Sequence, residues 1–178
     1  MQGIKEYIPT AQKIDYINAL LKVGFDTIDF GSFVSPKAIP QLRDTATVVR
    51  GLDLSRTQSK LLAIVANTRG AKEAAAFDEI TYLGYPFSIS EIFQKRNTNH
   101  TIQESLGILD NILDICDQNA KQLVVYISMG FGNPYREPWD VNVVERWCEK
   151  LVGKGVKILS LSDTIGTSNP ESITYLFS

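Results

Sequence analysis

The sequence predicts an α/β fold with a parallel sheet. Short runs rich in β-branched residues alternate with longer amphipathic runs along the 178 residues. The connections between these runs are short, which favours right-handed β/α crossovers. No repeat, low-complexity segment or linker interrupts the pattern, so we expect residues 1–178 to form a single domain. An open doubly wound sheet fits the same pattern, but no G-x-G-x-x-G turn follows any predicted strand, which removes its common nucleotide-binding version.

In the first half of the chain, two strands are expected among helices. Thr10 is predicted to cap a helix, and Gly24 follows its end. Residues 27–30 predict a strand, Ser35 and Pro36 a helical turn, and residues 41–51 a further helix. Residues 61–66 form an apolar run without alternation, which is typical of a strand covered on both faces, and residues 71–77 are rich in alanine and helical.

In the second half, three strands are expected. Residues 82–89 predict a strand despite Pro86, which is unusual in a central strand. Thr101 and Glu104 form a capping box that opens a helix to about residue 116. The remaining pattern predicts strands at 123–127 and 156–161, a helix at 139–152, and a last helix that starts after Asn169.

Composition excludes several classes of function. The chain has 18 basic and 20 acidic residues, a net charge of -2, which argues against a nucleic-acid surface or a basic membrane-binding face. No apolar run approaches the roughly 20 residues of a membrane span, and no secretory signal is visible. Cys116 and Cys148 match no zinc or disulfide spacing and suit a reducing compartment. We therefore expect a cytoplasmic protein with no nucleic-acid or membrane partner.

Two acids stand out at the ends of predicted strands, where the site of a β/α barrel forms. Asp29 lies within the first apolar strand, and Asp163 follows the last. Such a carboxylate is costly unless it binds a cation, accepts hydrogen bonds or is protonated. Two acids that converge on one mouth suit metal-assisted or acid–base chemistry. The alternative is that each caps the following helix or binds loop amides.

Basic residues and one histidine carry weaker signals. Lys37, Lys95 and Arg96 fit either a phosphate-binding rim for a carrier such as coenzyme A or a solvated face. His100 is the only histidine and precedes the capping Thr101, where a role on the surface or in stabilising the loop is the better interpretation.

Several motifs resemble the 3-hydroxy-3-methylglutaryl-CoA (HMG-CoA) lyase family, in family order and over nearly the whole chain. Residues 29–37 read D-F-G-S-F-V-S-P-K and are followed by I-P-Q at 39–41, close to the family's I-E-x-x-S-F-V-S-P-K-x-x-P-Q. The further matches are Asn67 with Gly70, S-E-x-F-x-K-x-N at 90–97, Tyr126-x-Ser128 with Gly132, Pro134 and Tyr135, and L-S-D-T-I-G at 161–166. The fold that this resemblance implies is a partial (β/α)₈ barrel, roughly its strands 2 to 6 with their helices, truncated at both ends.

The resemblance implies a carbon–carbon lyase that cleaves HMG-CoA to acetyl-CoA and acetoacetate with Mg²⁺ or Mn²⁺. Asp163 would be an active-site acid near the substrate hydroxyl, and Asp29 would take the place of the family's glutamate. The residues that would bind or brace the acyl-CoA substrate are Gln2, Lys5, Ser32, Asn67, Asn97, Tyr126 and Thr164. A homodimer is one assembly that fits the resemblance.

Departures from the family pattern concern the metal site and one loop. The family's Arg-Asp pair would precede Met1, and its H-x-H pair would follow Ser178, so no metal ligand is assigned here and most would lie outside this chain. Met129 and Asn133 replace two cysteines, and no arginine precedes Tyr126. We therefore expect the 178 residues alone to be inactive.

Two other functions stay open at this stage. Related barrels run a Claisen condensation of acetyl-CoA with a 2-oxo acid, as isopropylmalate and homocitrate synthases do, although the S-F-V-S-P-K block favours the lyase. A non-catalytic remnant that binds CoA is the second alternative.

Overall fold

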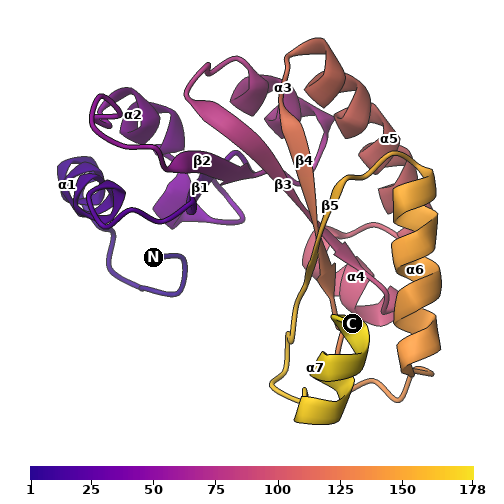
Figure 1. The fold of residues 1–178 in the computed structure, drawn as a ribbon. Helices are drawn as coiled ribbons and strands as arrows, with labels where there is room; N and C mark the ends of the chain where they lie inside the picture. The colour runs from indigo at the N-terminus through magenta and orange to yellow at the C-terminus, as the bar shows by residue number, and fades with distance from the viewer. The chain divides into compact units, whose positions relative to one another are not determined.

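The computed structural model describes residues 1–178 as alternating strands and helices (Figure 1). In chain order the elements are α1 (Thr10–Leu21), β1 (Thr27–Ser32), the 3₁₀ turn η1 (Pro40–Leu42), α2 (Thr45–Arg50), β2 (Lys60–Ile64), α3 (Thr68–Ala75), β3 (Ile80–Ser88), α4 (Glu91–Thr98), α5 (Ile102–Gln118), β4 (Gln122–Ser128), α6 (Val141–Gly153), β5 (Ile158–Leu161) and α7 (Pro170–Leu176). No helix combines the length and the apolar character that a membrane crossing needs.

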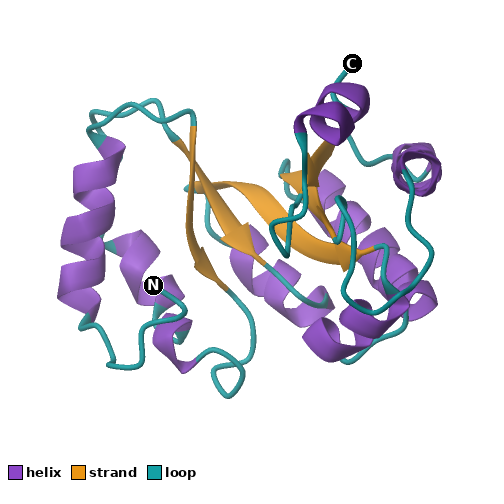
Figure 2. Cartoon of the chain, turned by 90° about the horizontal axis from the view of Figure 1, so that it is seen from below, coloured by secondary structure: helices purple, strands orange, loops and turns teal.

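The strands form one parallel sheet in the order β1-β2-β3-β4-β5. Each strand therefore lies beside its neighbour in sequence, as successive β/α units require. Helices separate the strands along the chain, as Figure 2 shows in purple and orange. The predicted α/β class with a parallel sheet is confirmed.

Contacts within the chain group it into two compact units. The first holds residues 1–84 and 115–122, and the second holds residues 85–114 and 123–178. The expectation that residues 1–178 form a single domain stays a prediction.

Each unit has its own apolar core. In the first, Leu61, Leu62 and Ala63 of β2 are buried in succession, as expected for a strand covered on both faces. In the second, the Phe87 ring lies 5.4 Å from the Trp147 ring. Further buried residues of the second unit are Leu109, Ile112, Val125, Ile127, Val144 and Leu151.

Strand β3 contains Pro86 although it has neighbours on both sides. Its last residue in register with β2 is Gly84, which pairs with Ile64. Pro86 lies beyond this pairing, so its missing N–H leaves the β2–β3 ladder intact.

The predicted helix starts are partly right. Thr101 N–H donates to Glu104 Oε2 at 2.7 Å and Glu104 N–H to Thr101 Oγ1 at 3.1 Å, which confirms the capping box. Asn169 likewise caps α7. The prediction for Thr10 is wrong: Thr10 is the first helical residue, and its hydroxyl donates to Asp44 at 2.7 Å instead of capping the helix.

Candidate active site

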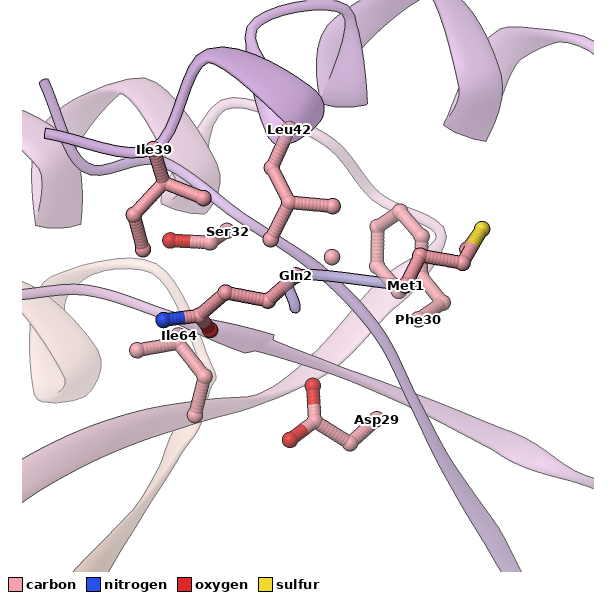
Figure 3. A pocket seen from close by; sticks show the side chains of 9 residues that line it. Met1, Gln2, Asp29, Phe30, Ser32, Ile39, Leu42 and Ile64 are labelled. Atoms are coloured by element: carbon pink, nitrogen blue, oxygen red, sulfur yellow. The ribbon is translucent and has the colours of Figure 1, made fainter. Parts of the chain in front are cut away.

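A cavity of about 200 Å³ lies at the carboxyl end of β1 (Figure 3). Polar side chains of Gln2, Asp29 and Ser32 line it together with apolar ones. The remaining lining residues are Met1, Phe30, Gly31, Ile39, Leu42 and Ile64. In Figure 3 the Asp29 carboxylate points towards the segment that carries Gln2. Three of the predicted site residues therefore share one cavity in the first unit.

Asp29 is the most perturbed group of this cavity. Its side chain stays exposed, yet the packed chain around it disfavours the charged form. Desolvation raises the pKa of the Asp29 carboxyl from 3.8 to about 6, although the nearby N-terminal ammonium opposes the rise. A carboxyl with this pKa holds both protonation states near neutral pH, which suits proton transfer.

The backbone around Asp29 departs from regular pairing. The register of β1 against β2 shifts between Asp29 and Gly31. Irregular pairing of this kind can redirect a side chain. A Cβ on Gly31 would lie 2.7 Å from Thr45 Cγ2, so this position accepts only glycine without a shift of Thr45.

Ser32 is 4% exposed, and both its polar ends have partners. Its N–H donates to Thr45 Oγ1 at 3.2 Å, and its hydroxyl accepts from Val34 N–H at 3.3 Å. These bonds fix the strand end at the cavity wall.

Gln2 and Lys5 come from the exposed segment before α1. A second cavity, of about 140 Å³, is lined by Gln2, Lys5 and Tyr7 with Ile4, Ile39, Pro40 and Gln41. Gln2 therefore lines both cavities, and Lys5 lines the second.

Asn67 has a structural task in the first unit. Its side chain accepts a hydrogen bond from Gly70 N–H at 2.9 Å and so caps α3. A Cβ on Gly70 would lie 2.3 Å from the Phe33 carbonyl oxygen, so α3 begins in direct contact with the chain after β1. Asn67 does not line the cavity that contains Asp29.

Asp163 lies in the second unit, in the exposed loop after β5. Its carboxylate accepts hydrogen bonds from Thr167 N–H at 2.9 Å and Ser168 N–H at 3.0 Å. Hydrogen bonds from the Ser168 side chain and the loop amides lower the pKa of Asp163. The structure thus bears out the alternative that Asp163 binds loop amides, and a catalytic role for it stays a proposal.

Thr164 connects two loops of the second unit. Its hydroxyl accepts a hydrogen bond from Met129 N–H at 2.8 Å, and Thr167 Oγ1 donates to the Phe131 carbonyl at 2.9 Å. Met129 has a φ of 61°. The loops after β4 and β5 are therefore held to each other by hydroxyl groups.

The other predicted residues of the second unit lie on different elements. Asn97 is exposed on α4, and Tyr126 is half-buried in β4. Lys95 pairs with Glu91 at 3.3 Å, and the Arg96 guanidinium lies 5.0 Å from the Tyr135 ring centre. Because Asn97, Tyr126, Asp163 and Thr164 belong to the second unit, their approach to Asp29 stays a prediction.

Sequence reasoning missed the polar residues that hold the first cavity's segment in place. Lys13 is buried on the apolar face of α1, and Gln41 and Asp44 contact the segment before that helix through Ile8 N–H and Tyr7 OH. The signal was present, because Lys13 falls at helical spacing with Ile17 and Leu21.

The residues described do not complete a metal site by themselves. Nowhere in the structure do three or more His, Cys, Asp or Glu side chains gather in a way that could hold a metal ion.

Parallel strands in sequential order, separated by helices and followed by polar groups, place this protein in the α/β class built from successive β/α units. The model of the HMGL-like family matches residues 1–178, and the chain belongs to this family.

Curated relatives agree with this family. The hydroxymethylglutaryl-CoA lyase YngG of Bacillus subtilis is 34% identical over 97% of this chain and 57% of its own length. The cytoplasmic 3-hydroxy-3-methylglutaryl-CoA lyase of Mus musculus is 32% identical over 97% of this chain and 50% of its own length. The chain thus spans about half the length of these relatives.

Solved structures confirm the fold as part of a (β/α)₈ barrel. The HMG-CoA lyase of Bacillus subtilis matches with a TM-score of 0.90 and 35% identity, over 99% of this chain and 58% of that one. An HMG-CoA lyase from Acinetobacter baumannii, solved in complex with coenzyme A and 3-methylmalate, matches with a TM-score of 0.90 and 30% identity, over 98% of this chain and 56% of that one.

Proposed function

We propose that the protein that carries this chain is a carbon–carbon lyase that cleaves HMG-CoA to acetyl-CoA and acetoacetate. Membership of the HMGL-like family and the names of the relatives support this reaction. Within the chain, the observation that carries the proposal is Asp29: an accessible carboxyl with a pKa of about 6 in a cavity beside Gln2 and Ser32.

The reaction needs one proton removed and one delivered. The hydroxyl at C3 loses its proton, and the bond between C2 and C3 breaks as C3 becomes the ketone of acetoacetate. The electron pair forms the enolate of acetyl-CoA, which then takes a proton at carbon. A carboxyl that is partly protonated near neutral pH can serve either transfer.

The roles that we propose follow the family pattern. Asp29 acts as the proton-transfer group of the first cavity, and Asp163 is an active-site acid near the substrate hydroxyl. Both are proposed as catalytic. The side chains proposed to bind the acyl-CoA are Gln2, Lys5, Ser32, Asn67, Asn97, Tyr126 and Thr164.

The proposal extends to cofactor, assembly and location. The cofactor is Mg²⁺ or Mn²⁺, with ligands that the described residues do not complete. The assembly is a homodimer and the location is the cytoplasm, as for the cytoplasmic mouse relative. Sedimentation and cell fractionation test these two points.

The test uses the polypeptide that the full reading frame encodes. Incubated with HMG-CoA and MgCl₂, it should release acetoacetate, while residues 1–178 alone should show no turnover. Asp29→Asn should lower kcat by roughly 100-fold or more, because general acid–base groups contribute about 10² to 10⁴. Asp26→Asn is the matched control, since this exposed acid precedes the same strand, and its carboxylate contacts only surface partners, Lys60 at 3.8 Å and the Thr27 hydroxyl at 2.7 Å.

Two other results would contradict the proposal. Release of free thiol from acetyl-CoA with a 2-oxo acid, without cleavage of HMG-CoA, would assign the condensing reaction. Binding of CoA with neither reaction would assign a non-catalytic protein.

A further inference from the structure

A buried charge lies on the apolar face of α1. Lys13 is 1% exposed and shares that face with Ile17 and Leu21. A buried ammonium is costly unless it is paired and hydrogen-bonded. Lys13 Nζ donates to the Gln41 carbonyl oxygen and to Asp44 Oδ1, the latter at 2.7 Å. The cost of burying Lys13 is therefore offset by the segment from Gln41 to Asp44.

The Asp44 carboxylate accepts hydrogen bonds from three side chains, one in the segment before α1 and two in the first turns of α1. Its Oδ2 accepts from Tyr7 OH at 2.8 Å and from Thr10 Oγ1 at 2.7 Å, while Oδ1 accepts from Lys13. Partial burial opposes ionisation of Asp44, but these hydrogen bonds outweigh it and lower the pKa of the carboxyl. The Tyr7 ring also lies 4.3 Å from Lys13 Nζ and 4.2 Å from the Arg43 guanidinium carbon.

Both polar atoms of the Gln41 side-chain amide form hydrogen bonds with the same segment. The side chain is 6% exposed, and its Oε1 accepts from Ile8 N–H at 2.9 Å. Its Nε2 donates to the carbonyl oxygens of Ile4, at 3.1 Å, and Glu6, at 2.8 Å. These bonds span the backbone on both sides of Lys5.

Residues 1–8 contain no helix or strand and are mostly exposed. A segment of this kind opens at little cost unless side chains anchor it. Its anchors converge on the short stretch from Gln41 to Asp44, and Gln41 and Tyr7 also line the second cavity with Gln2 and Lys5. The anchors therefore lie next to the two side chains that are proposed to face the substrate.

We propose that Lys13, Tyr7, Gln41 and Asp44 form a clamp that positions Gln2 and Lys5 for the acyl-CoA substrate. This inference rests on the proposed function. The four clamp residues act as positioning residues, because they hold the segment in place and none of them lines the cavity that contains Asp29. The clamp holds the segment by hydrogen bonds to Asp44 on one side and to the Gln41 amide on the other.

The test measures segment order and ligand binding in the same polypeptide, encoded by the full reading frame. Asp44→Asn removes the negative charge that holds Lys13. Tyr7→Phe removes a single hydrogen bond at an exposed residue, so this second variant tests the clamp even if Asp44→Asn folds poorly. Lys154→Met is the matched control, because it breaks an ion pair of the same length, 2.7 Å to Asp110, in the second unit.

Hydrogen exchange of the amides of residues 4–8 and calorimetric titration with coenzyme A are the two measurements. Asp44→Asn should speed exchange of the Ile8 amide and weaken coenzyme A binding about tenfold, with a smaller effect in Tyr7→Phe and none in Lys154→Met. In a Gln2→Ala background, Asp44→Asn should weaken binding less than about threefold. A merely structural role would not produce this coupling.

The outcomes separate the two proposals. If the wild-type polypeptide does not bind coenzyme A, the proposed function fails and the clamp's substrate role fails with it. If the wild type binds, but exchange is unchanged or the Asp44 and Gln2 effects are additive, only the clamp is overturned.

Discussion

At the scale of single residues, Asp29 combines accessibility with a pKa near 6. It stands in a strand whose next three residues are buried, and the pairing with β2 shifts around it. An acid with an ordinary pKa of 3.8 in this place would be ionised throughout the neutral range. Desolvation removes that preference, at a cost to the folded state when the carboxylate is charged.

Asp29 should therefore lower stability as pH rises. Because its folded pKa exceeds the ordinary 3.8, the folded chain keeps the proton up to about pH 6, and stability is lost between these two values. The Asp29→Asn variant has no carboxyl to ionise at this position. The change in the free energy of unfolding that it causes should therefore be about 1 kcal/mol more stabilising at pH 8 than at pH 3.5, after allowance for solvent screening.

Urea unfolding of wild type, Asp29→Asn and Asp26→Asn at both pH values measures this difference. An equal effect of Asp29→Asn at pH 3.5 and pH 8 would show that the Asp29 pKa is not raised. Asp26→Asn, which changes an exposed acid, should show no comparable gain.

At the scale of elements, the start of α3 shows how closely helices pack on the loops that shape the site. Asn67 caps the helix through Gly70 N–H, and Gly70 leaves room for the Phe33 carbonyl. The N-x-x-G motif thus has a packing reason: a cap and a close backbone approach fall within one turn.

Gly70→Ala should destabilise the chain by about 2 kcal/mol, because the new Cβ would meet a backbone atom at 2.3 Å and the helix must shift. Gly107→Ala is the matched control. Gly107 lies within α5 with nothing within 4 Å of an added Cβ, so this change should stabilise by up to about 1 kcal/mol. Thermal unfolding of the two variants compares them, and a neutral Gly70→Ala would refute the close contact.

Helix starts were predictable from the sequence where a side chain hydrogen-bonds within the first turn of its own helix. The Thr101–Glu104 box and the Asn169 cap are read from residues three apart, and both form as predicted. The short helix α4 was not predicted, since its start depends on Ser90 and on a Glu137 carboxylate that comes from 45 residues away. Thr10 was misassigned because its hydroxyl goes to Asp44, a partner that no local pattern reveals.

The candidate site divides in the same way. Asp29 was predicted from its cost in an apolar strand, and its cavity with Gln2 and Ser32 supports that choice. The clamp around Asp44 was not predictable from local sequence patterns, because Asp44 lies about 30 to 40 residues from its partners in the sequence. Asp163 satisfied the same rule as Asp29, but its loop supplies amide donors, so hydrogen bonding there lowers the pKa.

At the scale of the whole molecule, the order of the strands places successive β/α units side by side. In such a fold, groups at the carboxyl ends of different strands can serve one reaction. Asp29 belongs to the first unit and Asp163 to the second, so their common action is the central claim of the proposed function.

The measurement that tests this claim most directly is a double-mutant cycle on HMG-CoA cleavage. It compares kcat/KM of the full reading-frame polypeptide with that of Asp29→Asn, Asp163→Asn and the double variant. If the two carboxyls act as a unit, each single change should lower kcat/KM by roughly 100-fold or more, and the double change by little more than the worse single one. A single variant with near wild-type kcat/KM, or two losses that multiply in the double variant, would contradict a shared site.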